Sequence, residues 1–196
     1  MKRFVCGALA VLSVWCCLGR IASGSPEARE IDVAHSRLTV RVYKSGFLSA
    51  FGHDHDIQAP IQSGQVKADG DASVELRVDA RKLRILDTDV SGDTRSKIQE
   101  TMLSGQVLDA DRFPEIHFQS ARVEPKGQDH WMVHGNLGLH GEDHPIAFEV
   151  TLKDGRYRGS ATLKQTDFGI TPVNVAGGTV KVKDEVKIEF DIALMK

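Results

Sequence analysis

Two histidines form the most evident chemical motif of the chain. His53-Asp54-His55 sets them two residues apart. In a strand, alternate side chains share a face, so His53 and His55 would lie together and Asp54 opposite them. Two imidazoles on one face can bind a divalent metal, but catalytic zinc usually has three protein ligands. The spacing of the other histidines identifies no third ligand, so we favour hydrogen-bonding histidines at the rim of a β-barrel over a metal site.

A short apolar segment precedes this pair. Phe47, Leu48 and Phe51 are separated by glycine, serine and alanine. In a helical turn, Phe47 and Phe51 would lie on one side. Binding sites for apolar ligands are lined mainly by such side chains. The segment is therefore interpreted either as the lid or wall of a ligand site or as a plug that closes one end of a barrel.

Nucleophilic catalysis has little support in the sequence, because no arrangement of residues identifies a nucleophile and its base. The three cysteines of the sequence, Cys6, Cys16 and Cys17, all lie within the first 24 residues, which are predicted below to be removed. The chain also has no Gly-x-Ser-x-Gly elbow. We therefore predict a protein that is not an enzyme. No cofactor is expected, apart from the divalent metal that the histidine pair could hold.

The N-terminus has the pattern of a secretory signal. A basic start is followed by an apolar run over 4–18, and small residues lead to Gly24. We predict a signal peptide over 1–24 that is removed, a polar lead-in over 25–30 and one domain over 31–196. The protein would be periplasmic or secreted, with no membrane span after processing. Loss of Lys2, Arg3 and Arg20 takes the formal charge from −2 to −5, which disfavours nucleic acid as a partner.

Apolar and polar residues alternate along most of the remaining chain. This period of two occurs over 37–42, 73–79, 146–153 and 186–194. It is typical of antiparallel strands with one dry face and one wet face. Asp69-Gly70 and Asp154-Gly155 lie between alternating runs and predict hairpins, and 125–129 predicts a further loop. The fold class is therefore all-β, a barrel or a sandwich.

One segment has helical spacing instead. Ile98 and Met102 lie four residues apart, Asp93 could cap the helix, and Ser104-Gly105 could end it. We predict one short helix over 93–103, in a crossover between strands. Just upstream, Asp87-x-Asp89-x-Ser91-Gly92 resembles the start of a calcium loop. Ile98 stands where the closing acid should be, so these acids are predicted to be turn residues before the helix.

The run from Leu108 to Ser120 resembles a motif of the YceI-like family, which comprises secreted lipocalin-type bacterial proteins associated with binding polyisoprenoid lipids. The motif places an aspartate after an apolar residue, then an aromatic-proline pair, an apolar residue, a phenylalanine and a serine. Leu108-Asp109, Phe113-Pro114, Ile116, Phe118 and Ser120 match it. The stretches 32–38, 135–141 and 167–170 resemble further elements of the family in the same order. The acids after Gly141 depart from the family's usual turn.

The resemblance implies a lipocalin-like antiparallel barrel of about eight strands around an apolar cavity. The ligand would be an isoprenoid or quinone-like lipid, held by a carrier protein. The inward residues predicted to bind it are Phe47, Leu48, Phe51, Ile116, Phe118, Leu137, Phe148, Phe168, Ile188 and Phe190. Two alternatives remain: a metal-dependent function at His53 and His55, and a stress or interaction protein with a filled core. The oligomeric state is not predicted.

Overall fold

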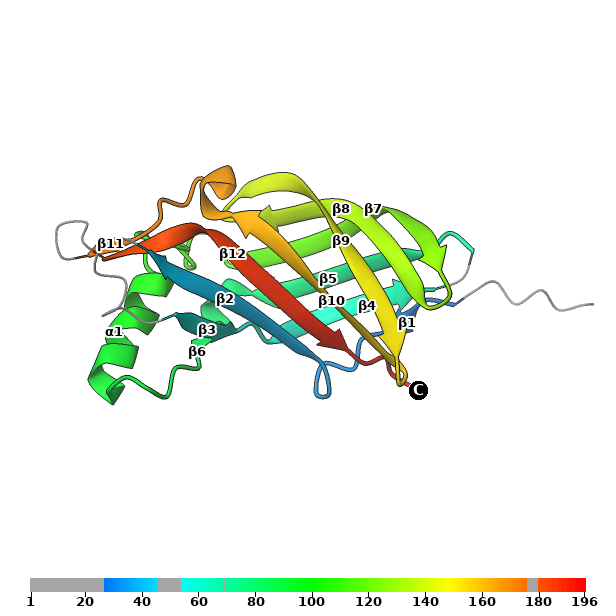
Figure 1. Ribbon diagram of the computed structural model, residues 1–196, viewed down its shortest axis with the longest axis horizontal. Coiled ribbons are helices and arrows are strands. Elements are labelled where there is room, and N and C mark those ends of the chain that lie inside the picture. The colour runs from blue at the N-terminus through cyan, green and yellow to red at the C-terminus, as the bar shows by residue number, and fades with distance from the viewer. Residues whose placement is uncertain (1–26, 46–53, 69, 176–179) are drawn as a thin grey trace, which may run out of the picture.

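A curled antiparallel sheet and one α-helix make up the computed structural model, which describes residues 27–45, 54–68, 70–175 and 180–196 (Figure 1). The strands are β1 (Arg29–Glu30), β2 (Arg37–Ser45), β3 (His55–Gln58), β4 (Ile61–Lys67), β5 (Ser73–Asp79), β6 (Arg84–Ile85), β7 (Glu115–Gly127), β8 (His130–Leu139), β9 (Glu142–Lys153), β10 (Arg156–Lys164), β11 (Asn174–Val175) and β12 (Val180–Ile192). The helix is α1 (Gly92–Leu103), and two 3₁₀ helices are η2 (Ala80–Lys82) and η3 (Gln165–Phe168). The predicted all-β class with one helix is confirmed.

The order of the strands brings the two edges of the sheet together. Neighbours follow the order β1-β4-β5-β7-β8-β9-β10-β12-β2-β3-β6, and β11 pairs with β12. Only Ala59 and Pro60 separate β3 from β4, which pair with β2 and β5 respectively. At the other end of the molecule, Ile31 forms a bridge with Leu194, just beyond β12. The sheet therefore curls into a barrel-like shape around an interior space.

The strand count differs from the prediction of about eight. The sheet has twelve strands. Eight of them have seven residues or more, and β1, β3, β6 and β11 have two to four. Such short strands hold too little alternation to be recognised in the sequence. Pro60, which has no N–H to donate, lies between β3 and β4.

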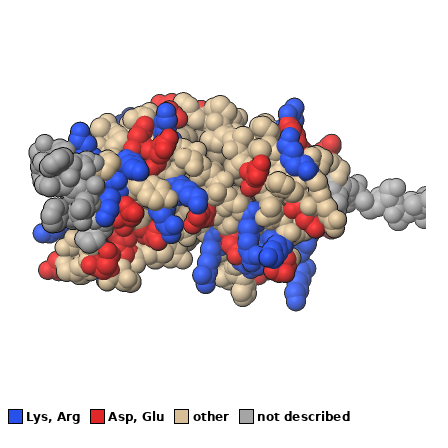
Figure 2. All heavy atoms as spheres, in the orientation of Figure 1, with Lys and Arg blue, Asp and Glu red and all other residues tan. Residues whose placement is uncertain are grey.

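The alternation of β12 separates an inner face from an outer face, as predicted. Val186, Ile188 and Phe190 line the interior. Between them, Lys187 donates to Glu189 at 2.6 Å on the outer face. Figure 2 shows acidic and basic side chains interspersed over the face that it draws. Strand β12 thus supplies one wall of the core and one charged surface.

The hairpin turns agree with the sequence at one place and differ at another. Asp154-Gly155 joins β9 to β10 with positive φ angles of 54° and 73°, as a two-residue hairpin turn requires. Asp69 of the other predicted turn lies outside the described residues. The loop predicted over 125–129 is wrong in its length, because β7 continues to Gly127 and the register shifts between Pro125 and Gly127. A bulge accommodates the proline within the strand.

Helix α1 lies at one end of the barrel (Figure 1). Arg95 and Gln99 of the helix donate to the backbone oxygens of Asp87 and Leu83 there. The cap of α1 is Ser91, which accepts from Thr94 N at 3.2 Å, so the prediction that Asp93 caps the helix is wrong. Asp93 lies instead in the first turn, where its charge favours the helix dipole. Met102 is buried against the core, as its spacing predicted. In the described part of the chain, no helix has both the length and the apolar character that crossing a membrane requires.

The family-like motifs meet beside the barrel core. The Phe113 ring packs edge-on against His140 at 4.7 Å between centroids. His140 Nδ1 donates to the carbonyl oxygen of Phe168 at 3.0 Å. A Cβ added to Gly141 would lie 2.6 Å from the Phe113 ring, and the φ of Gly141 is +81°. Motifs far apart in the sequence therefore hold one another in place, which is a structural role.

Candidate functional site

An apolar cavity of about 250 Å³ lies inside the curled sheet. On β8 alone, its lining runs from Trp131 to Leu139, about 26 Å at roughly 3.3 Å per residue. At the end covered by α1, Met102 and Leu108 contribute to the wall. Ligand pockets typically measure about 300–1,000 Å³, so this cavity is near the lower end of that range. Its length and composition suit a slender apolar chain.

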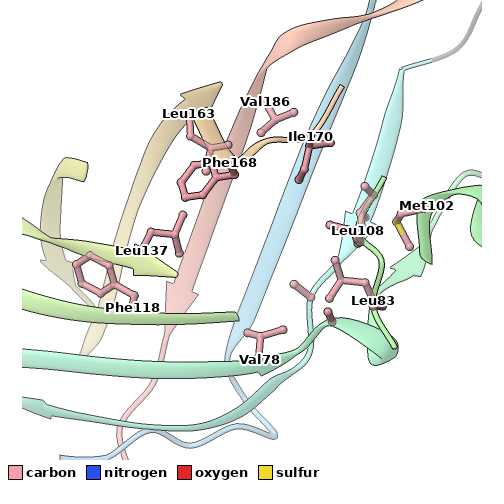
Figure 3. Packing of buried hydrophobic residues seen from close by; sticks show 14 of the residues in the cluster. Val78, Leu83, Met102, Leu108, Phe118, Leu137, Leu163, Phe168, Ile170 and Val186 are labelled. Carbon is pink, nitrogen blue, oxygen red and sulfur yellow. The ribbon is translucent and has the colours of Figure 1, made fainter. Parts of the chain in front are cut away.

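Six of the predicted ligand residues line this cavity. They are Ile116, Phe118, Leu137, Phe148, Ile188 and Phe190. Phe148 packs at 5.3 Å from Phe118 and at 5.4 Å from Phe190, measured between ring centroids. Figure 3 shows Phe118 and Leu137 among the buried side chains. The structure thus places these six where a ligand would contact them, and their role in binding remains a prediction.

Phe168 occupies a different position. It is 1% exposed but is not among the residues that line the cavity. It lies in η3, and its ring packs at 5.0 Å from His144. Phe47, Leu48 and Phe51 lie outside the described residues, so their predicted contact with a ligand also remains a prediction.

Much of the lining was not named from the sequence. The same alternating pattern identifies the strand residues among them, such as Val40, Val42, Leu76, Val133 and Val150. Other lining residues come from irregular segments, and no periodicity marks them: Leu83, Val107, Leu108 and Ile170. Leu83, Val107 and Leu108 come from the segments around α1, and Ile170 follows η3.

Gln165 is a polar member of the lining. Its Nε2 donates to Lys183 O at 2.8 Å. The next residue, Thr166, donates to Asp184 from its backbone N at 2.9 Å and from its hydroxyl at 2.7 Å. Burial alone would raise the pKa of Asp184, but these hydrogen bonds outweigh it and lower the pKa. The carboxylate thereby holds the start of η3 against β12.

His55 forms a pair with an aspartate that was interpreted as a turn residue. His55 Nδ1 lies 2.5 Å from Asp87 Oδ2, and Asp56 N donates to Asp87 Oδ1 at 3.1 Å. The Asp87 side chain is only 2% exposed and that of His55 is 21% exposed. From α1, Arg95 donates to the backbone oxygen of Asp87 at 2.9 Å. No sequence motif predicts that His55 and Asp87 interact. They come together because β3 pairs with β6.

The metal hypothesis is not tested by this arrangement. His53 lies outside the described residues. Within the ranges that the structure describes, no three His, Cys, Asp or Glu side chains group as metal ligands would. Of the other histidines, His140 packs against Phe113 and His144 packs against Phe168. A metal at His53 and His55 therefore stays a prediction.

Comparison with known proteins places the chain in a family. The model of the YceI-like domain matches residues 30–194. The chain belongs to the YceI-like family. It is 27% identical over 159 residues to a UPF0312 protein of Shewanella baltica strain OS155, covering 76% of this chain and 78% of that one. A UPF0312 protein of Shewanella oneidensis is 26% identical over 153 residues, covering 72% and 74%.

A solved structure shows the same fold. The crystal structure of BcnA from Burkholderia cenocepacia is similar with a TM-score of 0.68 and 19% identity, covering 85% of this chain and 99% of that one. At this identity the likeness concerns the fold alone. The barrel-like fold is therefore shared, and the cavity and its chemistry must be argued from the residues of this chain.

Proposed function

We propose that this YceI-like protein is exported to the periplasm and carries an isoprenoid-type apolar lipid in its cavity. One observation carries the proposal: a continuous, almost wholly apolar lining extends along the strands from Trp131 to Leu139. The family's association with polyisoprenoid lipids supports it. The proposed role is binding, without bond-making chemistry.

Burial of an isoprenoid chain would supply the affinity. Each methylene moved from water into an apolar site contributes about 0.8 kcal/mol, so few polar contacts are needed. A barrel of this size can be filled by its own side chains or can hold one small ligand. The cavity of about 250 Å³ favours the second possibility over a filled-core protein.

Export rests on the N-terminal sequence, because residues 1–26 lie outside the described structure. The basic start and the apolar run that follows support removal of residues 1–24. Intact mass measurement on protein from the periplasmic fraction is expected to give a mature chain that begins at Ser25. A full-length mass, or recovery only from the cytoplasm, would contradict export.

A matched pair of substitutions on β10 tests the cavity as the binding site. Ala161 lines the cavity, whereas its neighbour Thr162 is exposed on the opposite face. Ala161→Phe is expected to weaken binding of farnesol by roughly tenfold or more, because the new ring occupies space that the ligand needs. Thr162→Phe should bind like the wild type. Titration calorimetry measures both, with thermal unfolding to confirm that each variant folds.

Native mass spectrometry gives an independent test. Protein isolated from its own host is expected to retain an isoprenoid lipid that dissociates on activation in the gas phase. Recovery of empty protein that takes up no added prenyl lipid would contradict the proposal. Equal farnesol affinity for Ala161→Phe and Thr162→Phe would place any binding outside the cavity.

A further inference from the structure

His55 is the polar member of a row of paired residues that crosses four neighbouring strands near α1. Leu163 pairs with Val186, Val186 pairs with Val42, and Val42 pairs with His55 in adjacent ladders. Directly paired residues of antiparallel strands point to the same face of the sheet. Leu163, Val186 and Val42 all line the cavity. His55, the fourth position at this level, therefore lies on the inner face of the sheet, next to Val42 but just beyond the residues that line the cavity.

A buried carboxylate holds this imidazole in one orientation. Asp87 Oδ2 faces His55 Nδ1, and Asp87 Oδ1 is occupied by the backbone N–H of Asp56. A carboxylate accepts hydrogen bonds, so Nδ1 carries the proton and Nε2 of the neutral ring presents a lone pair. In the part of the chain that the structure describes, nothing is recorded as bonding to Nε2. A histidine backed by a carboxylate in this way is oriented to interact through its other nitrogen.

We propose that His55 Nε2 is the polar anchor of the cavity and accepts a hydrogen bond from a hydroxyl group at the head of the apolar ligand. The proposal rests on the proposed lipid-binding function and adds the chemistry of the head group. An isoprenoid alcohol and a prenylated quinol both carry such a hydroxyl. Asp87, which acts through His55, is a positioning residue.

The charges around His55 favour a neutral head group over an anionic one. The buried Asp87 carboxylate lies directly behind the ring. The Arg41 guanidinium is held by Asp56 at 2.7 Å, and Arg95 is engaged with the backbone oxygen of Asp87. A phosphate or carboxylate head group would be repelled by the Asp87 carboxylate, and Arg41 and Arg95 are already engaged with other partners.

The first experiment compares farnesol with farnesyl methyl ether, which has the same chain but no hydroxyl donor. The wild-type protein is expected to bind farnesol roughly three- to tenfold more tightly, as one net hydrogen bond allows. His55→Phe should remove this preference while still binding the ether. The matched control is His134→Phe. His134 is paired with Glu124 at 3.4 Å and alternates with the cavity-lining Val133, so it faces outward and its replacement should keep the preference.

The second variant, Asp87→Asn, changes the proton position without removing the ring. The amide oxygen would keep the bond from Asp56 N, so its NH₂ would face His55 Nδ1 and move the ring proton to Nε2. The preference for farnesol should then disappear or reverse, because Nε2–H can donate to the ether. The ¹⁵N shifts of the ring report the tautomer, a change that a merely structural role of Asp87 would not produce. This variant decides the matter if His55→Phe fails to fold.

The outcomes separate the two proposals. If the wild type and His55→Phe bind both probes with equal affinity, the head-group anchor is overturned and the lipid cavity stands. If neither probe binds the wild type, both proposals fall. Geranylhydroquinone and its dimethyl ether, tested in the same way, distinguish the sources of the hydroxyl: a larger preference with the quinol pair assigns a phenol, and a larger one with the farnesyl pair assigns an alcohol.

Discussion

At the scale of single residues, glycines make room for the aromatic wall of the cavity. Gly159 is paired with Phe190 across β10 and β12, and Phe190 lines the cavity. A Cβ added to Gly159 would lie 2.5 Å from the Phe190 ring and would also press on the backbone oxygen of Glu149. A Cβ added to Gly135 would likewise lie 2.5 Å from the Phe118 ring. These glycines let large rings fold over a neighbouring strand and form the wall.

Gly159→Ala is therefore expected to lower the free energy of unfolding by about 1–3 kcal/mol, the usual cost of overpacking. Gly92→Ala is a suitable control, because a Cβ there meets nothing within 4 Å and Gly92 opens a helix that alanine favours. The control should be neutral, or more stable by up to about 1 kcal/mol. Urea unfolding measures both. Equal stability of the two variants would show that the Phe190 ring moves aside at no cost.

At the scale of elements, the Gln99 side chain of α1 bonds to the backbone at β6 in the way that a neighbouring strand would. Gln99 Oε1 accepts from Ile85 N at 2.9 Å, and Gln99 Nε2 donates to Leu83 O at 2.8 Å. Leu83 and Ile85 are both buried, so these backbone groups depend on the glutamine in place of water. The segment over 83–85, which leads to Asp87, is stabilised in this way.

Gln99→Ala should destabilise the protein by about 1–3 kcal/mol, because it leaves buried backbone groups without partners. The amides of α1 should also exchange hydrogen faster than in the wild type. Glu100→Ala, at the exposed neighbouring position, is the control and should change stability by less than about 0.5 kcal/mol. A Gln99→Ala variant with the exchange rates of the wild type would contradict this account of how α1 is held.

At the scale of the whole molecule, charge pairs on the outer face link strands that are distant in the sequence. Asp191 on β12 accepts from Arg156 and, at 3.1 Å, from Arg158 on β10. Arg156 also donates to His35 O at 2.6 Å, in the segment before β2. Burial alone would raise the pKa of Asp191, but the two arginines outweigh it and hold the pKa below its usual value.

This shift predicts how stability depends on acid. A carboxyl group whose folded pKa lies below its unfolded value, about 3.9 for aspartate, stabilises the fold above that value and stops doing so as the pH falls through the folded pKa. Asp191→Asn should therefore be less stable than the wild type by a constant amount between about pH 6 and 8, and the difference should shrink below about pH 4. Denaturant unfolding across pH measures this. The control is Asp154→Asn, at an exposed turn, whose stability relative to the wild type should not depend on pH in this way. A loss of stability in Asp191→Asn that stays the same at every pH would contradict the predicted role of the Asp191 pKa.

Local patterns determined the greater part of this fold from the sequence. Alternation identified β2, β5, β9 and β12, because a strand with one wet face must repeat every two residues. Asp154-Gly155 identified a hairpin because only certain residues adopt its positive φ angles readily. Of the six predicted residues that line the cavity, Phe148, Ile188 and Phe190 lie in alternating runs, whereas Ile116, Phe118 and Leu137 lie in the stretches that resemble the family. The motif from Leu108 to Ser120 indicated the family. Each of these signals is read within one short segment.

The tertiary structure determined the features that depend on segments distant in the sequence. Periodicity reports which face a residue occupies, but not what lies across from it. Whether the interior is filled depends on curvature and on side chains from strands far apart in the sequence, and so it required the structure. Phe168 is buried yet lies outside the cavity lining because the chain leaves β10 and turns into η3. His55 and Asp87 meet only through the pairing of β3 with β6, so the buried carboxylate that orients this imidazole could not be identified from the His53-Asp54-His55 motif.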